Sequence, residues 1–165
     1  MRDKVSEARV ALLHPSVRAE VKQLIEKSES GFPPTMAVRI VQGLRTIKEQ
    51  NDLYAQGRTK PGNVVTNAKG GSSFHNYGLA IDFAILTDKD GNGSFEDLSW
   101  DIKKDNDKDG IADWLEVVKV FEAAGWSWGG KWATLKDYPH LQKTFGYTWQ
   151  QLFEKVKRGE EYVSL

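Results

Sequence analysis

One carboxylate inside an apolar run constrains the fold of this chain more than any other residue. Residues 79–86 (LAIDFAIL) have the composition of a buried strand, and strand alternation places Asp82 on the same face as Ala80 and Ala84. Burying a carboxylate on such a face is costly unless a metal ion or a cation offsets the lost hydration. Hydrogen bonds from nearby backbone amides are the alternative, because buried polar groups find partners.

A metal centre at this strand can draw on few side chains. The 165 residues include no cysteine and only three histidines, so any metal must be bound by His, Asp or Glu. A catalytic zinc site combines three protein ligands with one open position, and His75, Asp82 and His140 would supply such a set. Asp137, three residues before His140, could reach the attacking water as a general base. His14 precedes a predicted helix, where a structural role is expected.

An acidic segment follows the Asp82 strand. Residues 88–116 carry ten acids and four lysines, whereas the whole chain has a formal net charge of zero. Residues 105–116 (DNDKDGIADWLE) match the twelve-residue calcium loop, with glycine at its sixth position and Glu at its twelfth. The predicted calcium ligands are Asp105, Asp107, Asp109, the backbone carbonyl of Ile111, Asp113 and Glu116. A solvated acidic loop is the alternative interpretation.

A second segment, residues 88–93 (DKDGNG), begins the same pattern. Ser99 stands where the loop requires its bidentate Glu. We therefore expect residues 88–92 to bind an ion more weakly, to contribute ligands to one shared ion, or to form a turn without an ion.

Hydrophobic periodicity and turn residues predict the secondary structure. Helices are expected at 15–28, 46–57, 113–124 and 148–159, and strands at 35–41, 79–86, 126–132 and 139–142, with a long loop over 58–74. Thr46 with Glu49 and Thr148 with Gln151 predict capping boxes, and Asp113 with Glu116 forms a cap-like pair at the start of the 113–124 helix. Core packing is the favoured role of Gln50. The mixture predicts one α+β domain spanning 1–165, in which helices pack on a small, mainly antiparallel sheet, with the calcium loop as an insertion at about 87–116.

Two signatures connect the chain to a known family. Residues 72–83 (SSFHNYGLAIDF) match the pattern S-x-H-x-x-G-x-A-x-D, and residues 137–142 (DYPHLQ) match a second motif of the same family. The chain thus resembles the zinc peptidases that include VanY-type D-alanyl-D-alanine carboxypeptidases and L-alanyl-D-glutamate peptidases. Residues 43–83 and 126–140 are most similar to the L-alanyl-D-glutamate branch, found in phage endolysins and bacterial wall hydrolases.

The resemblance implies a hedgehog-like fold and a role for each matching residue. The implied zinc ligands are His75, Asp82 and His140. The implied catalytic base is Asp137. Arg45 is implied to bind the substrate carbonyl or to stabilise the oxyanion. Ser73 is implied to lie near the substrate, although hydrogen bonding within its loop explains that serine equally well.

The implied activity is zinc-dependent cleavage of the L-Ala–D-Glu bond in the peptidoglycan stem peptide. A D-alanyl-D-alanine carboxypeptidase of the same fold and a non-catalytic, metal-stabilised wall-binding module are the alternatives. The charge balance is not that of a nucleic-acid-binding protein, and no run approaches the ~20 apolar residues of a membrane span. We expect a monomer. Because no signal peptide is visible, we expect either a phage enzyme released by the host lysis machinery or export to the bacterial wall by an unseen route.

Overall fold

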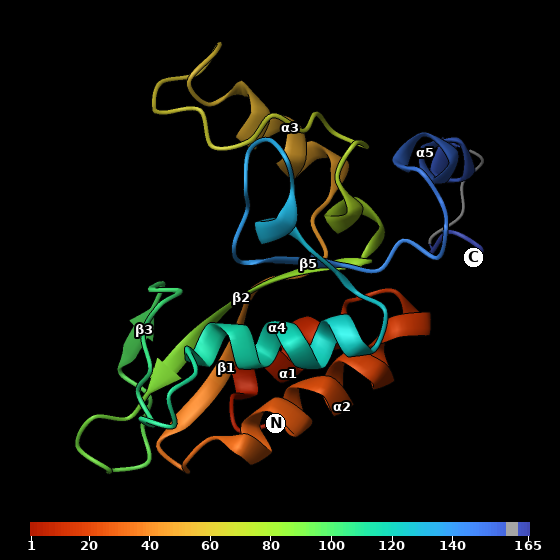
Figure 1. Ribbon diagram of the computed structural model, residues 1–165. Helices are drawn as coiled ribbons and strands as arrows, with labels where there is room; N and C mark the ends of the chain where they lie inside the picture. Colours follow the sequence, from red (N-terminus) through yellow and green to blue (C-terminus); the bar gives the residue numbers. More distant parts are fainter. Residues whose placement is uncertain (158–161) are drawn as a thin grey trace.

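The chain folds around one antiparallel sheet in a computed structural model that describes residues 1–157 and 162–165. In the view of Figure 1, helices lie both below and above the sheet. The lower group is α1 (Lys4–Ala11), α2 (Pro15–Gly31) and α4 (Asp113–Ala123), and the upper group is α3 (Ile47–Ala55) and α5 (Trp149–Lys157). The predicted α+β class is confirmed. Among the described residues, no helix is long and apolar enough to cross a membrane.

The sheet places the two family signatures on neighbouring strands. Its five strands are β1 (Met36–Gln42), β2 (Ala80–Thr87), β3 (Asp97–Ser99), β4 (Ser127–Trp128) and β5 (His140–Gln142). The order is β1-β2-β5-β4, and β3 also pairs with β2. All pairings are antiparallel, and the β2–β5 register sets Asp82 opposite His140 and Ala80 opposite Gln142.

Strand β2 is buried on both faces. Leu79, Ile81 and Phe83 are inaccessible to solvent, and so are Ala80 and Ala84 on the opposite face. The ring of Phe83 packs on Trp114 of α4, with the two centroids 4.5 Å apart. The predicted burial of the Asp82 strand is therefore confirmed, and the carboxylate lies between two alanines as alternation requires.

Helix α2 follows the predicted stripe but extends further than predicted. Val17, Val21, Leu24 and Ile25 are all buried, as periodicity indicated. The helix continues to Gly31 because Glu29 is also buried, where it accepts the backbone N–H groups of Arg2 and Val38. His14 is the N-cap, accepting from the Ser16 N–H at 3.2 Å, which is the structural role expected of it.

Helix α1 was not predicted, because it has no apolar stripe; only Ser6 and Val10 are buried. It is held by its cap instead. Asp3 accepts from the backbone of Val5 and Ser6, and its carboxylate pairs with Arg39 of β1 at 2.6 Å. A tertiary ion pair thus replaces the hydrophobic pattern from which helices are predicted.

The helix starts were predicted correctly in two cases and wrongly in a third. The capping box of Thr46 and Glu49 is present, and Thr148 and Gln151 form the reciprocal bonds of another. Asp113 and Glu116 do not cap α4: its N-cap is Ala112, which makes no side-chain cap bond. Asp113 instead accepts from the backbone and side chain of Asn106. The predicted helix end at Gly159 lies outside the described residues.

Candidate metal centre and cleft

His75 reaches the sheet from a short 3-10 helix, η1 (Phe74–Tyr77), that precedes β2. Ser73 caps η1 by accepting the His75 N–H at 3.4 Å. Gly78 ends η1 in the left-handed region, at φ 67°, and a Cβ there would collide with the backbone of His14. Glycine therefore permits the turn that aims His75 at the strand it precedes. The Ser73 hydroxyl is also part of the cleft wall described below.

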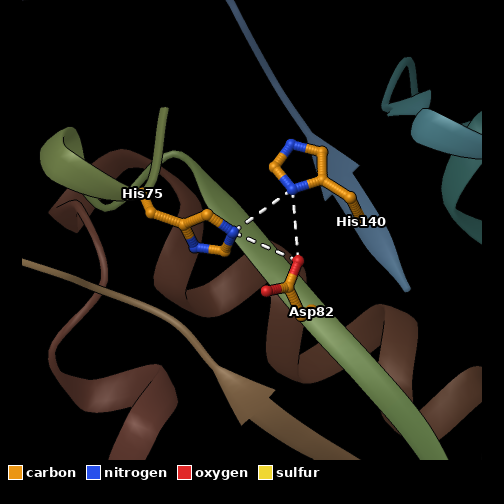
Figure 2. Close-up of side chains that lie close together, drawn as sticks. All are labelled: His75, Asp82 and His140. Carbon is orange, nitrogen blue, oxygen red and sulfur yellow. Dashed lines mark hydrogen bonds and ion pairs between the residues drawn. The ribbon is translucent and has the colours of Figure 1, made fainter. Parts of the chain in front are cut away.

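Figure 2 shows His75, Asp82 and His140 converging from η1, β2 and β5. Their facing atoms form a nearly regular triangle. His75 Nε2 lies 3.1 Å from Asp82 Oδ1, His140 Nδ1 lies 3.1 Å from the same oxygen, and the two nitrogens are 3.2 Å apart. The structure therefore brings together all three residues of the predicted zinc set.

The triangle fits a tetrahedral zinc ion. Zinc–nitrogen and zinc–oxygen bonds of about 2.0–2.2 Å imply ligand atoms about 3.3 Å apart, close to the observed spacings. The donor set of two imidazoles and one carboxylate is one that zinc accepts. The two histidines are only 2% and 4% exposed, so the ion would be shielded from solvent on the protein side. Burial alone would raise the pKa of Asp82, but His75 and His140 lower it below its usual range.

Asp137 is held beside this triangle by a glycine turn, η2 (Gly129–Lys131). Its N–H donates to Gly129 O at 3.1 Å, and its own carbonyl accepts the His140 N–H at 3.2 Å. Burial raises the pKa of Asp137, and the negative charge of Asp82 raises it further. A carboxylate with a raised pKa is a stronger base, which suits the predicted role.

Arg45 also lies close to the triangle. Its backbone N–H donates to the His75 carbonyl at 3.0 Å, and its side-chain Nη2 lies 3.9 Å from Asp82 Oδ2. Burial lowers the pKa of Arg45, against the opposing effect of Asp82. Its Nε is buried and has no hydrogen-bond partner within the described part of the chain. The guanidinium thus retains a donor that no described protein atom uses.

Gln50 has a larger part in the site than the sequence indicated. Core packing was the favoured interpretation, and Gln50 is indeed completely buried. However, its Oε1 accepts from Arg45 Nη1 at 2.9 Å, and its Nε2 donates to Ala68 O at 2.8 Å. It therefore ties Arg45 to the loop over 58–73. A buried amide on an amphipathic helix indicates that a polar partner is needed, but it does not identify Arg45 as that partner.

These residues line an open cleft of about 990 Å³. Ser73, Asp137 and the three converging side chains form its polar floor. Apolar residues on two loops form its rims and remain exposed: Val64, Val65 and Leu135, together with Trp132 and Trp149. Leu135 is 69% exposed and has a left-handed backbone, at φ 52°. The loop residues Val64, Val65 and Leu135 could not be predicted as cleft residues, because single apolar residues in loops carry no periodicity.

The acidic loop gathers the side chains predicted to bind calcium. Carboxylate oxygens of Asp105, Asp107 and Asp113 lie within 4.8 Å of one another, and so do those of Asp107, Asp109 and Glu116. Burial and the three neighbouring aspartates raise the pKa of Glu116 to about 7. The side chain of Ile111 points partly to solvent, and Gly110 adopts φ 93° at the turn.

The Asp88 segment forms a hydrogen-bonded turn. Asp88 accepts from the backbone N–H groups of Gly91, Asn92 and Gly93. Its carboxylate also lies within 4.8 Å of those of Asp90 and Glu96. The turn accounts for the burial of Asp88 without an ion.

Comparisons with known proteins agree on one family. Residues 66–143 match a family model described as D-alanyl-D-alanine carboxypeptidase. The peptidoglycan L-alanyl-D-glutamate endopeptidase CwlK of Bacillus subtilis (strain 168) is 48% identical over 130 residues, which cover 79% of this chain and 72% of that protein. The crystal structure of the Serratia marcescens L-Ala D-Glu endopeptidase ChiX matches with a TM-score of 0.50 at 20% identity, covering 86% of this chain and 88% of that one. The likeness to ChiX supports the fold alone.

Proposed function

Because the chain belongs to the family of zinc peptidases that contains D-alanyl-D-alanine carboxypeptidases and L-alanyl-D-glutamate peptidases, we propose that it hydrolyses peptidoglycan at the L-Ala–D-Glu bond of the stem peptide. Its similarity to CwlK supports this bond over D-Ala–D-Ala. The observation that carries the proposal is the triangle of His75, Asp82 and His140 on the floor of an open cleft that also contains Asp137.

We assign zinc to His75, Asp82 and His140. When bound, zinc supplies Lewis-acid chemistry, polarising the scissile carbonyl and lowering the pKa of a water molecule. The remaining steps belong to side chains of this chain. Asp137 accepts the proton of the attacking water and passes it to the leaving amine. Arg45 donates hydrogen bonds to the carbonyl oxygen as negative charge develops there. Its buried Nε, which has no hydrogen-bond partner among the described residues, supports this role.

The position of Ser73 supports a contact with the substrate near the reacting bond. Ser73 lines the cleft, and its hydroxyl accepts a long hydrogen bond from the His75 N–H. The apolar rims of the cleft suit the methyl groups of a peptide rich in alanine. A bound stem peptide would therefore lie between the loops that carry Val65 and Leu135, with its scissile carbonyl directed at the floor.

Digestion of purified peptidoglycan, followed by mass spectrometry of the muropeptides, tests the cleavage site. A newly exposed D-Glu amine is the expected product. Release of terminal D-Ala alone would instead establish the D-alanyl-D-alanine carboxypeptidase alternative. A wall-binding module would sediment with the peptidoglycan and release neither product.

We further propose that the insertion at about 87–116 binds calcium through the loop from Asp105 to Glu116. Two carboxylate oxygens there, Asp105 Oδ1 and Glu116 Oε2, are buried and have no hydrogen-bond partner in the described residues. Such atoms are costly without a counter-charge. Calorimetric titration of the zinc-loaded protein with calcium tests this proposal. Heat of binding in the wild type but not in Asp105→Ala is the expected result, and no heat in the wild type would contradict it.

The remaining proposals concern the form in which the enzyme acts. We propose that residues 1–165 act as one catalytic domain and as a monomer on the bacterial wall. The enzyme would reach the wall either from a phage, through the host lysis machinery, or by an export route that the sequence does not reveal. Sedimentation equilibrium tests the monomer; a dimer at working concentration would contradict it.

A further inference from the structure

We propose that Gln142 is a positioning residue that fixes the tautomer of His140 and so prepares its Nδ1 to bind the metal. This inference rests on the proposed function, because it assumes that His140 is a zinc ligand. The evidence is a hydrogen bond of 2.9 Å between His140 Nε2 and Gln142 Oε1, on the side of the imidazole that faces away from the triangle.

The two histidines of the triangle present different nitrogens. His75 turns its Nε2 inward, whereas His140 turns its Nδ1 inward. A neutral imidazole has one N–H and one lone pair, and only the nitrogen with the lone pair can bind a metal. His75 must therefore carry its proton on Nδ1, and His140 must carry its proton on Nε2. The chain needs opposite tautomers at two residues in one site.

Each outward nitrogen has its own acceptor. His75 Nδ1 lies 2.8 Å from the carbonyl oxygen of Gly43, which the fold supplies from the backbone. The acceptor for His140 is a side chain, and it is therefore open to substitution. Because His140 is only 4% exposed, solvent offers little to replace Gln142 as an acceptor. Outer acceptors of this kind set both the tautomer and the orientation of a metal-binding histidine.

The inner face of the triangle makes this selection necessary. Asp82 Oδ1 lies 3.1 Å from His140 Nδ1, so without a metal the carboxylate favours a proton on that nitrogen. A proton there would occupy the lone pair that the metal requires. By accepting from Nε2–H, Gln142 stabilises the other tautomer. Gln142 and Asp82 thus compete for the single imidazole proton from opposite sides of the ring.

Strand geometry explains how Gln142 reaches the imidazole. Residues two apart in a strand project from the same face, so Gln142 stands beside His140 on the metal side of β5. Its cross-strand partner is Ala80 of β2, just as the partner of His140 is Asp82. A methyl group at position 80 occupies little of the space beside Gln142. The same pair of strands therefore positions the ligands and the residue that orients one of them.

Zinc affinity, measured on the full chain by competition with a chelator, tests the inference. Gln142→Leu removes the acceptor at similar volume and is expected to weaken zinc binding about 10–100-fold, as outer acceptors of metal ligands do. Gln142→Glu keeps an acceptor at the same position and is expected to retain the wild-type affinity or exceed it. Gln23→Leu makes the same exchange at an exposed position of α2 and is expected to have no effect. Wild-type affinity in Gln142→Leu, or an equal loss in both Gln142 variants, would overturn the inference.

Nitrogen-15 NMR of the histidines gives a readout that a purely structural role would not change. In the zinc-free full chain, at a pH where the imidazole is neutral, the fraction of His140 with its proton on Nε2 is expected to be lower in Gln142→Leu than in the wild type and higher in Gln142→Glu. Equal fractions in the wild type and Gln142→Glu would refute the inference even if Gln142→Leu failed to fold. Failure of the proposed function can be told apart from failure of this inference. If His140 and His75 do not bind zinc, His75→Ala will leave zinc binding unchanged, and NMR can still report the tautomer of His140.

Discussion

Asp82 and His140 lie directly opposite each other in the β2–β5 register, with Asp82 Oδ1 3.1 Å from His140 Nδ1. The two residues are 58 positions apart in the chain. Side chains alternate across a strand, so a slip of one residue in this pairing would turn one of them to the other face. The metal centre is therefore a product of strand register as much as of residue type.

Replacement of Asp137 by Asn is expected to lower kcat by about 10²–10⁴-fold, the contribution of a positioned general base. The amide keeps the size of the side chain but cannot accept the proton of water. Initial rates of muropeptide release measure the effect, and zinc content should remain that of the wild type. The matched control is Asp101→Asn, outside the cleft. An Asn variant that hydrolyses peptidoglycan at the wild-type rate would show that Asp137 is not the base.

Replacement of Arg45 by Met is expected to reduce kcat by about 10²–10³-fold with a smaller change in KM, because its hydrogen bonds strengthen as charge develops in the transition state. Steady-state kinetics on a soluble stem peptide separates the two constants. Since Arg45 Nη2 also lies 3.9 Å from Asp82, zinc content must be measured alongside. A rise in KM alone would assign Arg45 to ground-state binding.

Replacement of Gly129 by Ala is expected to lower activity by about 10²-fold through displacement of the base, a loss typical of misplacement by about 1 Å. A Cβ at position 129 would collide with the Asp137 carbonyl and would lie 3.2 Å from the Cβ atoms of Asp137 and His140. The control is Gly31→Ala, where the nearest atom would be 3.9 Å away. Equal rates for the two variants would mean that the turn moves without disturbing Asp137.

Glu116 is expected to make the stability of the calcium-free protein depend on pH. Its pKa is about 7 in the fold, against 4.5 for an ordinary Glu, so between these values the folded state binds the extra proton. Its contribution to stability is therefore fully present below pH 4.5 and is lost as the pH rises through 7. In calcium-free buffer with zinc present, the melting temperature should fall between pH 5 and pH 8. This fall should be larger for the wild type than for Glu116→Gln.

Calcium provides the complementary test of the same residue. At pH 8, added calcium should raise the melting temperature of the wild type by mass action and leave that of Glu116→Gln nearly unchanged. Two equally steep pH profiles would show that Glu116 does not cause the dependence. An equal calcium response in both proteins would remove Glu116 from the proposed ligands.

The sequence predicted those parts of the fold and the site that depend on local pattern. Strand β2, the stripe of α2 and the Thr46 capping box follow from periodicity and from short-range hydrogen bonds. The grouping of His75, Asp82 and His140 could be predicted because the chain has only three histidines and no cysteine, which leaves few possible metal ligands. Helix α1 could not be predicted in this way, because the contact between Asp3 and Arg39 that holds it joins segments far apart in the chain.

The roles of Gln50 and Gln142 also depended on distant contacts. Gln50 has an unremarkable place in a helical pattern, and its connection to Arg45 and Ala68 exists only once the 58–73 loop has folded back. Gln142 follows His140 by two positions, but its role requires knowing which imidazole nitrogen faces Asp82. Neither orientation is encoded by a local sequence rule.

The central position of β5 has a consequence for the timing of activity during protein synthesis. The strand lies between β2 and β4, although it begins at His140, 53 positions after β2 ends at Thr87. A chain still emerging from the ribosome can form its N-terminal helices with β1 and β2, yet it lacks both Asp137 and His140. The proposed metal centre therefore cannot form until the chain has been synthesised through His140, because the earlier elements carry only His75 and Asp82.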